Sequence, residues 1–149
     1  MRATFGTAPA CWLAQWPLLF TRNEIRRAVS IIDVHGCALL AEVAAHSRSV
    51  GGLAAGPAGH GPVGATLLAS VGEDTFLHVW ALPNNHRGRG SSSGGGTLLG
   101  PANDVELVFS DRPEDAVLTG VCMAADDSGR ILASAYGERS LLVWDPNGR

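Results

Sequence analysis

The sequence predicts an all-β fold of short antiparallel strands, and two observations lead to this prediction. From Val29 onward, runs rich in Val, Ile and Leu alternate with Gly, Pro, Asp and Asn, a texture typical of strands separated by tight turns. The chain also contains the same hairpin twice, at 67–80 and at 131–144, each time as an apolar strand, an acidic turn and a strand ending in Trp. The pattern predicts strands at 29–34, 38–43, 49–55, 65–71, 75–82, 104–109, 117–124, 130–136 and 140–145.

Residues 1–28 do not fit this pattern and are left as an unassigned N-terminal segment. The spacing of their apolar residues is irregular, and a helix could start at Asn23 with that residue as its N-cap. The domain proper is therefore expected to cover 29–149.

Each expected turn has residues suited to it. His35-Gly36 tolerates a positive φ, and Asp126-Asp127-Ser128-Gly129 ends in the glycine that a hairpin with a left-handed residue needs. The acidic turns of the two repeated hairpins are Gly72-Glu73-Asp74 and Gly137-Glu138-Arg139. Between the strands, 83–103 is rich in Gly and Ser and is predicted to be a flexible insert, because such residues do not offset the entropy lost on ordering.

Composition narrows the function classes. The 149 residues are 46% hydrophobic and 17% charged, with a net charge of −3, so disorder is not expected and no global charge favours nucleic acid. All eleven cationic residues are Arg, which excludes every lysine-based chemistry.

The three cysteines are widely spaced and the first apolar stretch is too short to span a bilayer, which suggests a cytoplasmic protein. His35 and Cys37 share a turn, but no ligand set with metal-binding spacing is present, so neither a metal nor a cofactor is predicted.

The period of the repeat narrows the fold. Trp80 and Trp144 lie 64 positions apart, and about 43 once the insert at 83–103 is left out. That spacing lies within the roughly 40–45 residues of a propeller blade of the WD-repeat kind.

The chain resembles the WD-repeat family of β-propellers. The resemblance rests on His46 after an apolar strand, Ser70 within a strand, Asp74 in a tight turn and Trp80 in the following strand. It implies that these four residues form a buried hydrogen-bonded tetrad with a structural role. The second copy ends in the dipeptide that names the family, and its signature residues are Ser134, Trp144 and Asp145.

The second copy departs from the family pattern, because Glu138 stands in place of the turn Asp and no His lies near 113–116. This blade is expected to lack the tetrad. The expected strands give about two and a half blades, fewer than the four to eight of a closed ring. The chain is accordingly expected to be a partial propeller, the C-terminal part of a larger ring.

The resemblance implies a non-enzymatic scaffold that binds proteins or peptides, neither nucleic acid nor a membrane, with self-association possible through unpaired blade edges. One alternative is a hydrolase using Ser70 and His46, although Ser70 lacks the Gly-x-Ser-x-Gly elbow of many serine hydrolases. A second alternative is a truncated product without independent function.

Overall fold

The computed structural model describes residues 10–13, 18–23, 25–34, 37–57, 66–82, 105–113, 116–124 and 128–145. Over these residues it contains eleven strands and no helix, so the predicted all-β class is confirmed. All nine predicted strands are found, with ends shifted by at most two residues. The strands are β1 (Ala10–Leu13), β2 (Leu18–Asn23), β3 (Ala28–Asp33), β4 (Ala38–Ala44), β5 (Val50–Pro57), β6 (Thr66–Gly72), β7 (Leu77–Leu82), β8 (Glu106–Asp111), β9 (Leu118–Met123), β10 (Ile131–Ala135) and β11 (Leu141–Trp144).

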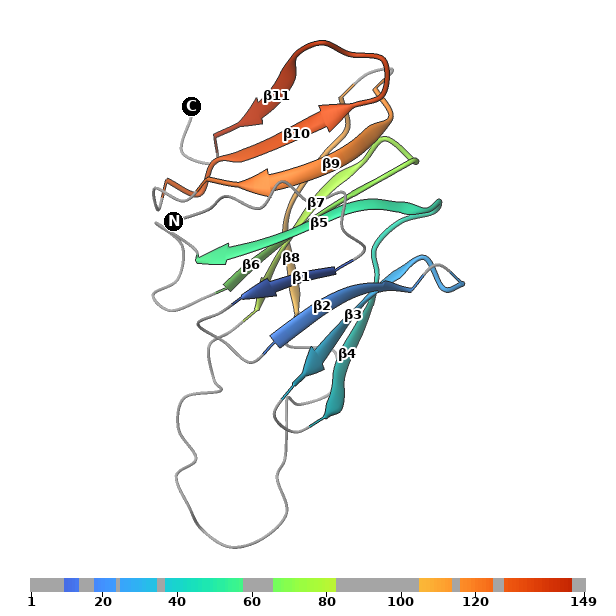
Figure 1. The fold of residues 1–149 in the computed structure, drawn as a ribbon, viewed down its shortest axis with the longest axis vertical. Helices are drawn as coiled ribbons and strands as arrows, with labels where there is room; N and C mark the ends of the chain where they lie inside the picture. Colours follow the sequence, from blue (N-terminus) through green and yellow to red (C-terminus); the bar gives the residue numbers. More distant parts are fainter. Residues whose placement is uncertain are drawn as a thin grey trace, which may run out of the picture.

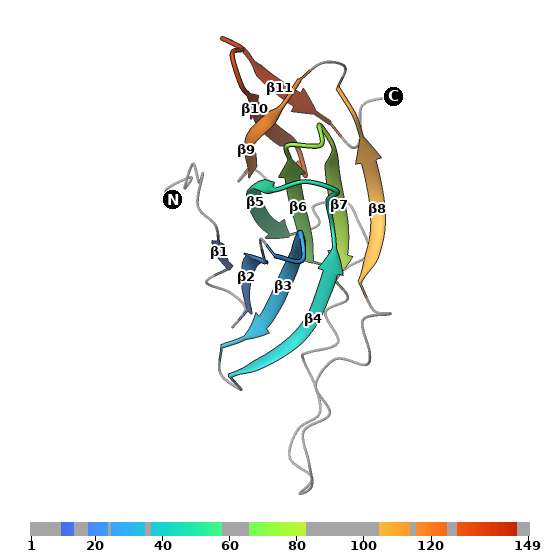
Figure 2. The same cartoon turned by 90° about the vertical axis from the view of Figure 1, so that its right-hand side faces the viewer.

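The strands form three antiparallel sheets that follow one another along the molecule (Figures 1 and 2). The first sheet has the order β1-β2-β3-β4, the second β5-β6-β7-β8, and the third β9-β10-β11. Strand β5 packs against β1 and β2 of the first sheet and against β9 of the third. The second sheet is therefore covered on both faces.

The first sheet begins earlier than the sequence predicted. Residues 10–13 and 18–23 form its first two strands, so this sheet has four strands rather than the two assigned to it. The helix that could have started at Asn23 does not form, because residues 25–27 are a turn and β3 begins at Ala28. Asn23 does accept a hydrogen bond at its Oδ1 from the backbone N–H of Arg26, at 3.2 Å, as an N-cap would. The chain then reverses through Arg27, whose φ is +53°, and enters β3 instead of a helix.

Two hydrophobic clusters separate the sheets. The first lies between the first and second sheets and is centred on Phe20 and Ile31, both with no exposed surface, together with Leu68. The second lies between the second and third sheets and contains Ala69, Leu77 and Leu118. Neighbouring residues of β6 thus belong to different clusters, because successive side chains of a strand point to opposite faces.

The second and third sheets approach closely where β5 crosses β9. A Cβ atom added at Gly51 would lie 2.7 Å from the carbonyl oxygen of Leu118, and one at Gly52 would lie 3.1 Å from the backbone of Gly120. Both neighbours are backbone atoms and cannot rotate away. The two glycines therefore set the separation of the sheets at this point.

The turns agree in part with the sequence prediction. Gly129 has a φ of +72°, as its turn was expected to require, and Gly137 has a φ of +79°. In the turn after β6 the left-handed residue is Thr75, at φ +72°. The insert at 83–103, the dipeptide His35-Gly36 and Asp126-Asp127 lie outside the described residues. No helix long and apolar enough to cross a membrane occurs in the part of the chain that the structure describes.

The close approach of β5 to β9 yields a prediction. Gly51→Ala will lower the free energy of unfolding by about 1–3 kcal/mol, because the new methyl group meets a backbone oxygen and the sheets must separate. Gly56→Ala is the matched control on the same strand, since a Cβ there would meet only the flexible side chain of Met123, at 3.4 Å from Sδ. Chemical denaturation of the three proteins measures the difference. Equal stabilities for the two variants would show that the sheets can part at no cost.

Candidate functional site

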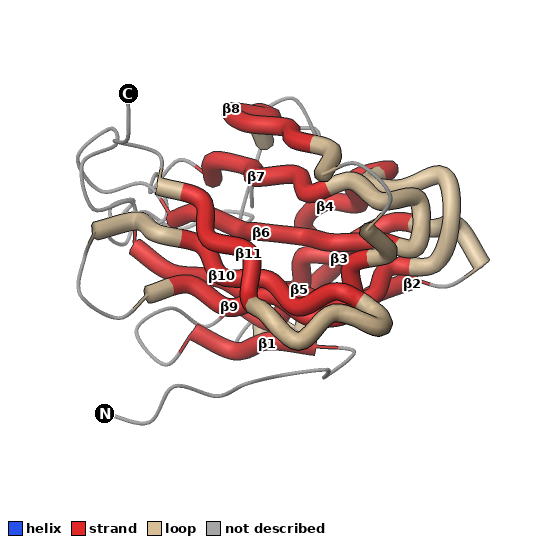
Figure 3. The backbone as a smooth tube through the Cα atoms, turned by 90° about the horizontal axis from the view of Figure 1, so that it is seen from above, coloured by secondary structure: helices blue, strands red, loops and turns tan. Residues whose placement is uncertain are grey.

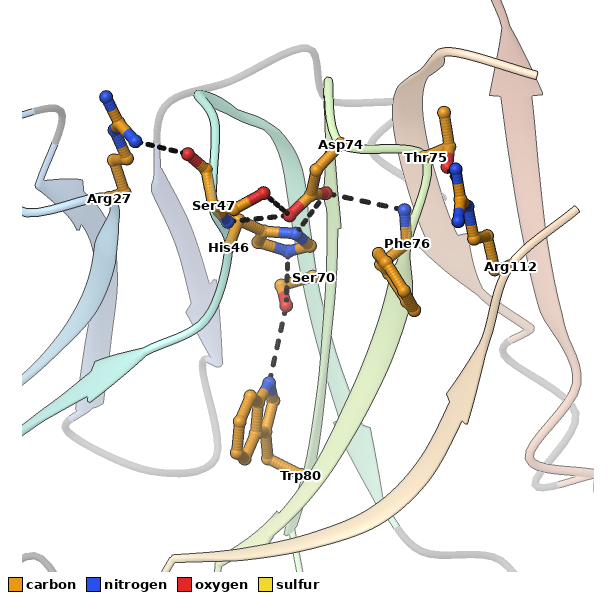
Figure 4. A network of polar contacts seen from close by, with 9 residues as sticks. All are labelled: Arg27, His46, Ser47, Ser70, Asp74, Thr75, Phe76, Trp80 and Arg112. Carbon is orange, nitrogen blue, oxygen red and sulfur yellow. Dashed lines mark hydrogen bonds and ion pairs between the residues drawn. The ribbon is translucent and has the colours of Figure 1, made fainter. Parts of the chain in front are cut away.

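The four residues expected to form a tetrad come from two neighbouring strands and two connections. Ser70 lies within β6 and Trp80 within β7, the strand that pairs with it. Asp74 lies in the turn between these strands, and His46 lies in the loop of residues 45–49 that leads from the first sheet into the second. Figure 4 shows the four side chains converging beneath this loop.

The structure brings the four side chains into one hydrogen-bonded chain. The indole Nε1 of Trp80 donates to Ser70 Oγ at 3.3 Å. Ser70 Oγ lies 3.0 Å from His46 Nε2, and His46 Nδ1 lies 2.8 Å from Asp74 Oδ1. Ser70 has no exposed surface and His46 is 8% exposed, so the centre of the chain is shielded from water.

The direction of every bond follows from the groups at the two ends. An indole N–H can only donate, so Ser70 Oγ accepts from Trp80 and keeps its own proton for His46 Nε2. An ionised carboxylate can only accept, so His46 must carry its proton on Nδ1. Neutral His46 in this one tautomer gives every polar side chain of the tetrad a hydrogen-bond partner. A second proton on His46 would leave the hydroxyl of Ser70 without its acceptor.

Asp74 extends the chain into the loop above it. Its Oδ2 accepts from the backbone N–H of Ser47 at 2.7 Å, and its Oδ1 also accepts from the N–H of Phe76 at 3.4 Å. On the other side of the loop, the Arg27 guanidinium donates to the carbonyl of Ser47, and the N–H of His46 donates to the carbonyl of Arg27 at 3.2 Å. The network therefore ties a turn of the first sheet to a turn of the second (Figure 4).

A second histidine lies against this network. The ring of His78 is 4.9 Å from that of His46, between centroids, and stacks on Phe76 at 5.4 Å. Its Nδ1 is buried and has no hydrogen-bond partner among the described residues. The guanidinium of Arg112 covers the Phe76 ring at 5.5 Å from its centroid and donates from Nε to Thr75 Oγ1 at 2.9 Å.

Burial lowers the pKa of both histidines. For His46, desolvation outweighs the attraction of the Asp74 carboxylate, so its pKa lies below the ordinary value. For His78, desolvation and then the charge that His46 would carry both lower the pKa. Burial alone would raise the pKa of Asp74, but hydrogen bonds from Ser47 and His46 more than offset it and the pKa falls below its usual range. The site thus holds two neutral histidines beside one carboxylate.

The geometry does not support the hydrolase alternative. Asp74, His46 and Ser70 do follow one another in the order of a catalytic triad, and His46 is within hydrogen-bonding distance of the Ser70 hydroxyl. A nucleophile must reach its substrate, however, and Ser70 lies within a central strand with no exposed surface. Its lone pairs also accept the indole proton of Trp80. The arrangement is suited to holding the loop rather than to attacking a substrate.

The second copy of the hairpin makes different contacts. Ser134 Oγ lies 3.2 Å from Thr119 Oγ1 on the neighbouring strand β9. The indole of Trp144 donates to the carboxylate of Asp111, at the end of β8 in the second sheet. Asp145 accepts from Arg130 Nε at 3.0 Å. Trp144 therefore links two sheets, whereas Trp80 donates its hydrogen bond to a residue of its own sheet.

Several residues of the network were not identified from the sequence, namely Arg27, Ser47, His78, Asp111 and Arg112. Ser47 follows His46 directly, but nothing in the sequence shows that its backbone N–H faces Asp74. The contact between Asp111 and Trp144 joins residues 33 positions apart in different sheets, and no local pattern predicts it. Among the described residues, no group of three His, Cys, Asp or Glu side chains is arranged to hold a metal ion.

No protein-family model and no curated protein matches the chain. Among solved structures, the fold is similar to the crystal structure of the β-propeller domain of Cps50 (Swd1) from Myceliophteria thermophila, with a TM-score of 0.63 and 12% sequence identity. The likeness covers 93% of this chain and 35% of that one. The three sheets thus have the arrangement of successive propeller blades, and the predicted fold, a partial β-propeller, is confirmed.

The two neutral histidines predict a loss of stability in acid. Because the folded-state pKa values of His46 and His78 lie below those of the unfolded chain, the unfolded chain binds more protons as the pH falls below about 6.5. The midpoint of thermal unfolding should therefore fall between pH 7 and pH 5. It is measured by circular dichroism across this range.

The variant His78→Phe isolates one of the two contributions. It removes a buried nitrogen that has no partner and retains a ring against Phe76, so we expect little change at pH 7.5 and a shallower fall in acid. A variant with the same pH dependence as the native chain would show that His78 is not held neutral.

Proposed function

We propose that this chain is a non-enzymatic WD-repeat scaffold that binds proteins or peptides, and that it is related to the C-terminal blades of WD repeat-containing protein 54. The propeller fold supports the first part. The residues His46, Ser70, Asp74 and Trp80, together with Trp144-Asp145 in the second copy, support the assignment to the WD-repeat family. The stretches Ala44–Arg48 and Gly72–Trp80 support the narrower relationship.

The main observation behind a scaffold role is the buried chain from Trp80 to Asp74. It fixes the positions of the loop at 45–49 and of the turn at 73–76. Both lie at the end of the sheets that is at the right of Figure 1. The turn between β2 and β3 and the turn between β10 and β11 lie at the same end. Ile25 in the β2–β3 turn is 96% exposed, and Tyr136 in the β10–β11 turn is 81% exposed. Exposed aromatic and aliphatic side chains on turns at one end of a sheet structure are typical of protein-binding surfaces.

The charges of this end favour a protein partner over nucleic acid. Arginines and acidic residues are interleaved there, and Arg26 is already paired with Glu42 at 2.6 Å. A nucleic-acid surface needs an excess of unpaired positive charge along the phosphate path. We further propose a cytoplasmic location, which is supported by the free thiols of Cys37 and Cys122.

A binding selection tests the scaffold role. Peptides displayed on phage are selected against the full chain, and each binder is measured against the double variant Ile25→Asp, Tyr136→Asp. We expect at least tenfold weaker binding, since both changes put charge where an apolar contact is made. Leu39→Asp, at a residue 60% exposed on β4, is the matched control and should leave binding unchanged. A selection without binders, or binders lost equally with the control, would contradict this assignment.

The role of Ser70 is tested separately. Ser70→Ala leaves the indole of Trp80 and Nε2 of His46 without a buried partner, so the free energy of unfolding should fall by about 1–3 kcal/mol. Ester hydrolysis is measured on the same samples and should be at background level in both proteins. Turnover that disappears with Ser70 while stability is unchanged would establish an enzyme and refute the structural role.

A further inference from the structure

The loop that leads from the first sheet into the second carries an arginine between two residues whose backbones are held. The backbone N–H of Ser47 donates to Asp74 Oδ2 at 2.7 Å, and its carbonyl accepts a hydrogen bond from the first sheet. The carbonyl of Ser49 accepts from the backbone N–H of Glu73 at 3.0 Å. Between them, the side chain of Arg48 is exposed and forms no hydrogen bond or ion pair with the described residues. A free guanidinium is therefore presented on a fixed backbone.

A second arginine is held on the neighbouring turn by its side chain. Nε of Arg112 donates to Thr75 Oγ1 at 2.9 Å, and the guanidinium lies over the ring of Phe76, 5.5 Å from its centroid. A guanidinium has five N–H donors, so four remain on the two terminal nitrogens. Arg112 is exposed, and these four form no hydrogen bond with the described residues. Such a planar fork matches a carboxylate, and here its orientation is set before a ligand binds.

Thr75, which holds this arginine, has an unfavourable backbone conformation. Its φ of +72° lies in the left-handed region, which a β-branched residue seldom adopts. Its backbone N–H donates to the carbonyl of Gly72 at 3.1 Å and closes the turn. Backbone strain persists where surrounding contacts hold it, and strained residues cluster at ligand-binding sites. The conformation of Thr75 is thus a second feature, independent of charge, that marks this turn.

The acidic side chains nearby do not neutralise the two arginines. Asp74 is engaged by the tetrad and by the loop above it, and only 8% of its side chain is exposed. Asp111 accepts from the indole of Trp144 and from a backbone N–H. Glu73 is exposed, but it forms no ion pair with either arginine. Both guanidiniums are therefore open to a carboxylate from another molecule.

The two arginines flank the turn from different sides. The loop and the turn lie side by side at one end of the strands (Figure 3). Figure 4 shows Arg112 on one side of Asp74 and Ser47, the neighbour of Arg48, on the other. A phosphate group is best bound by several donors that converge on it, whereas two guanidiniums on either side of a turn suit two separate carboxylates.

We propose that Arg48 and Arg112 each bind a carboxylate side chain of one acidic segment of a partner protein, which lies across the turn at 73–76. This inference rests on the proposed scaffold function and adds the chemistry of the partner. The loop and the turn lie between the turn that carries Ile25 and the turn that carries Tyr136, at the right of Figure 1. The partner segment accordingly has acidic residues at its centre and apolar residues toward its ends.

The composition of selected peptides gives the first test. Random peptides displayed on phage are selected against the full chain at low salt, and the binders should be enriched in Asp and Glu relative to the unselected library. Their affinity should fall at least fivefold when the salt rises from about 50 to 300 mM, because exposed charges are screened. Binders that lose affinity with Ile25→Asp, Tyr136→Asp but show no excess of acidic residues would overturn this proposal and leave the scaffold function standing. A selection without binders would overturn both.

Arg48→Gln is the decisive variant, because the side chain that it replaces forms no polar contact that the fold could lose. It should weaken the acidic binders at least fivefold and leave thermal unfolding unchanged. Arg112→Gln should weaken them at least tenfold, since a guanidinium that is already oriented loses less freedom on binding. Arg130→Gln is the control, since Arg130 is exposed but precedes β10, at the opposite end of that strand from Tyr136. An unchanged affinity with Arg48→Gln, or equal weakening by Arg130→Gln, would refute the proposal.

Substitutions in the peptide identify the two pairs. In one selected binder, each acidic residue is replaced in turn by its amide and measured against the native chain and the two variants. The carboxylate that binds Arg48 should matter for the native chain and far less for Arg48→Gln, and a different carboxylate should behave in this way with Arg112→Gln. Purely additive losses for every acidic residue would show that the charges act only at long range, and the two contacts would be disproved.

Discussion

The hydrogen bond between His46 and Ser70 is the contact on which the order of this end of the molecule depends. It joins a loop that leaves the first sheet to a central strand of the second. Through Asp74 the same chain holds the backbone of Ser47, and through Arg27 that backbone is held from the other side. His46 and Ser70 are buried and Asp74 is half-buried, whereas Arg27 and Ser47 are exposed, so the network runs from the core to the surface of the loop. The loop between the two sheets is thus held by hydrogen bonds from both of them.

The hydrophobic contacts between the sheets depend on a different constraint, which is the small size of the residues where they meet. Gly51 and Gly52 allow the backbones of β5 and β9 to come together, and Ala54, Ala69 and Ala133 fill the contact with little volume. The larger side chains Phe20, Ile31 and Leu68 lie between the first and second sheets. The second sheet therefore has a bulky face and a shallow face, and its two neighbours are not interchangeable.

The sequence predicted the strands well where turn chemistry and apolar runs coincide, and the repeated hairpin identified the correct class of fold. It failed before residue 28, where β2 alternates buried Leu18 and Phe20 with less buried Leu19 and Thr21 over too few residues to stand out. Asn23 was misread because an Asx turn and a helix N-cap begin with the same hydrogen bond. The residues of the tetrad were found by resemblance, since their spacing matches a known pattern. Arg27, His78 and Asp111 were missed, because their roles come from contacts between sheets that no local pattern reveals.

The hydrogen bond from Trp144 to Asp111 makes the third sheet depend on the second. In the first hairpin, the indole of Trp80 finds its acceptor, Ser70, within its own sheet. In the second hairpin, the indole of Trp144 finds its acceptor in the preceding sheet. A substitution at Asp111 therefore removes a hydrogen bond from β11, 33 residues further along the chain. Ser134 contacts Thr119 instead of the indole, while Asp111 accepts the indole proton of the next repeat. The second and third sheets therefore share a polar contact as well as an apolar one, and a substitution at Asp111 weakens the hold on both.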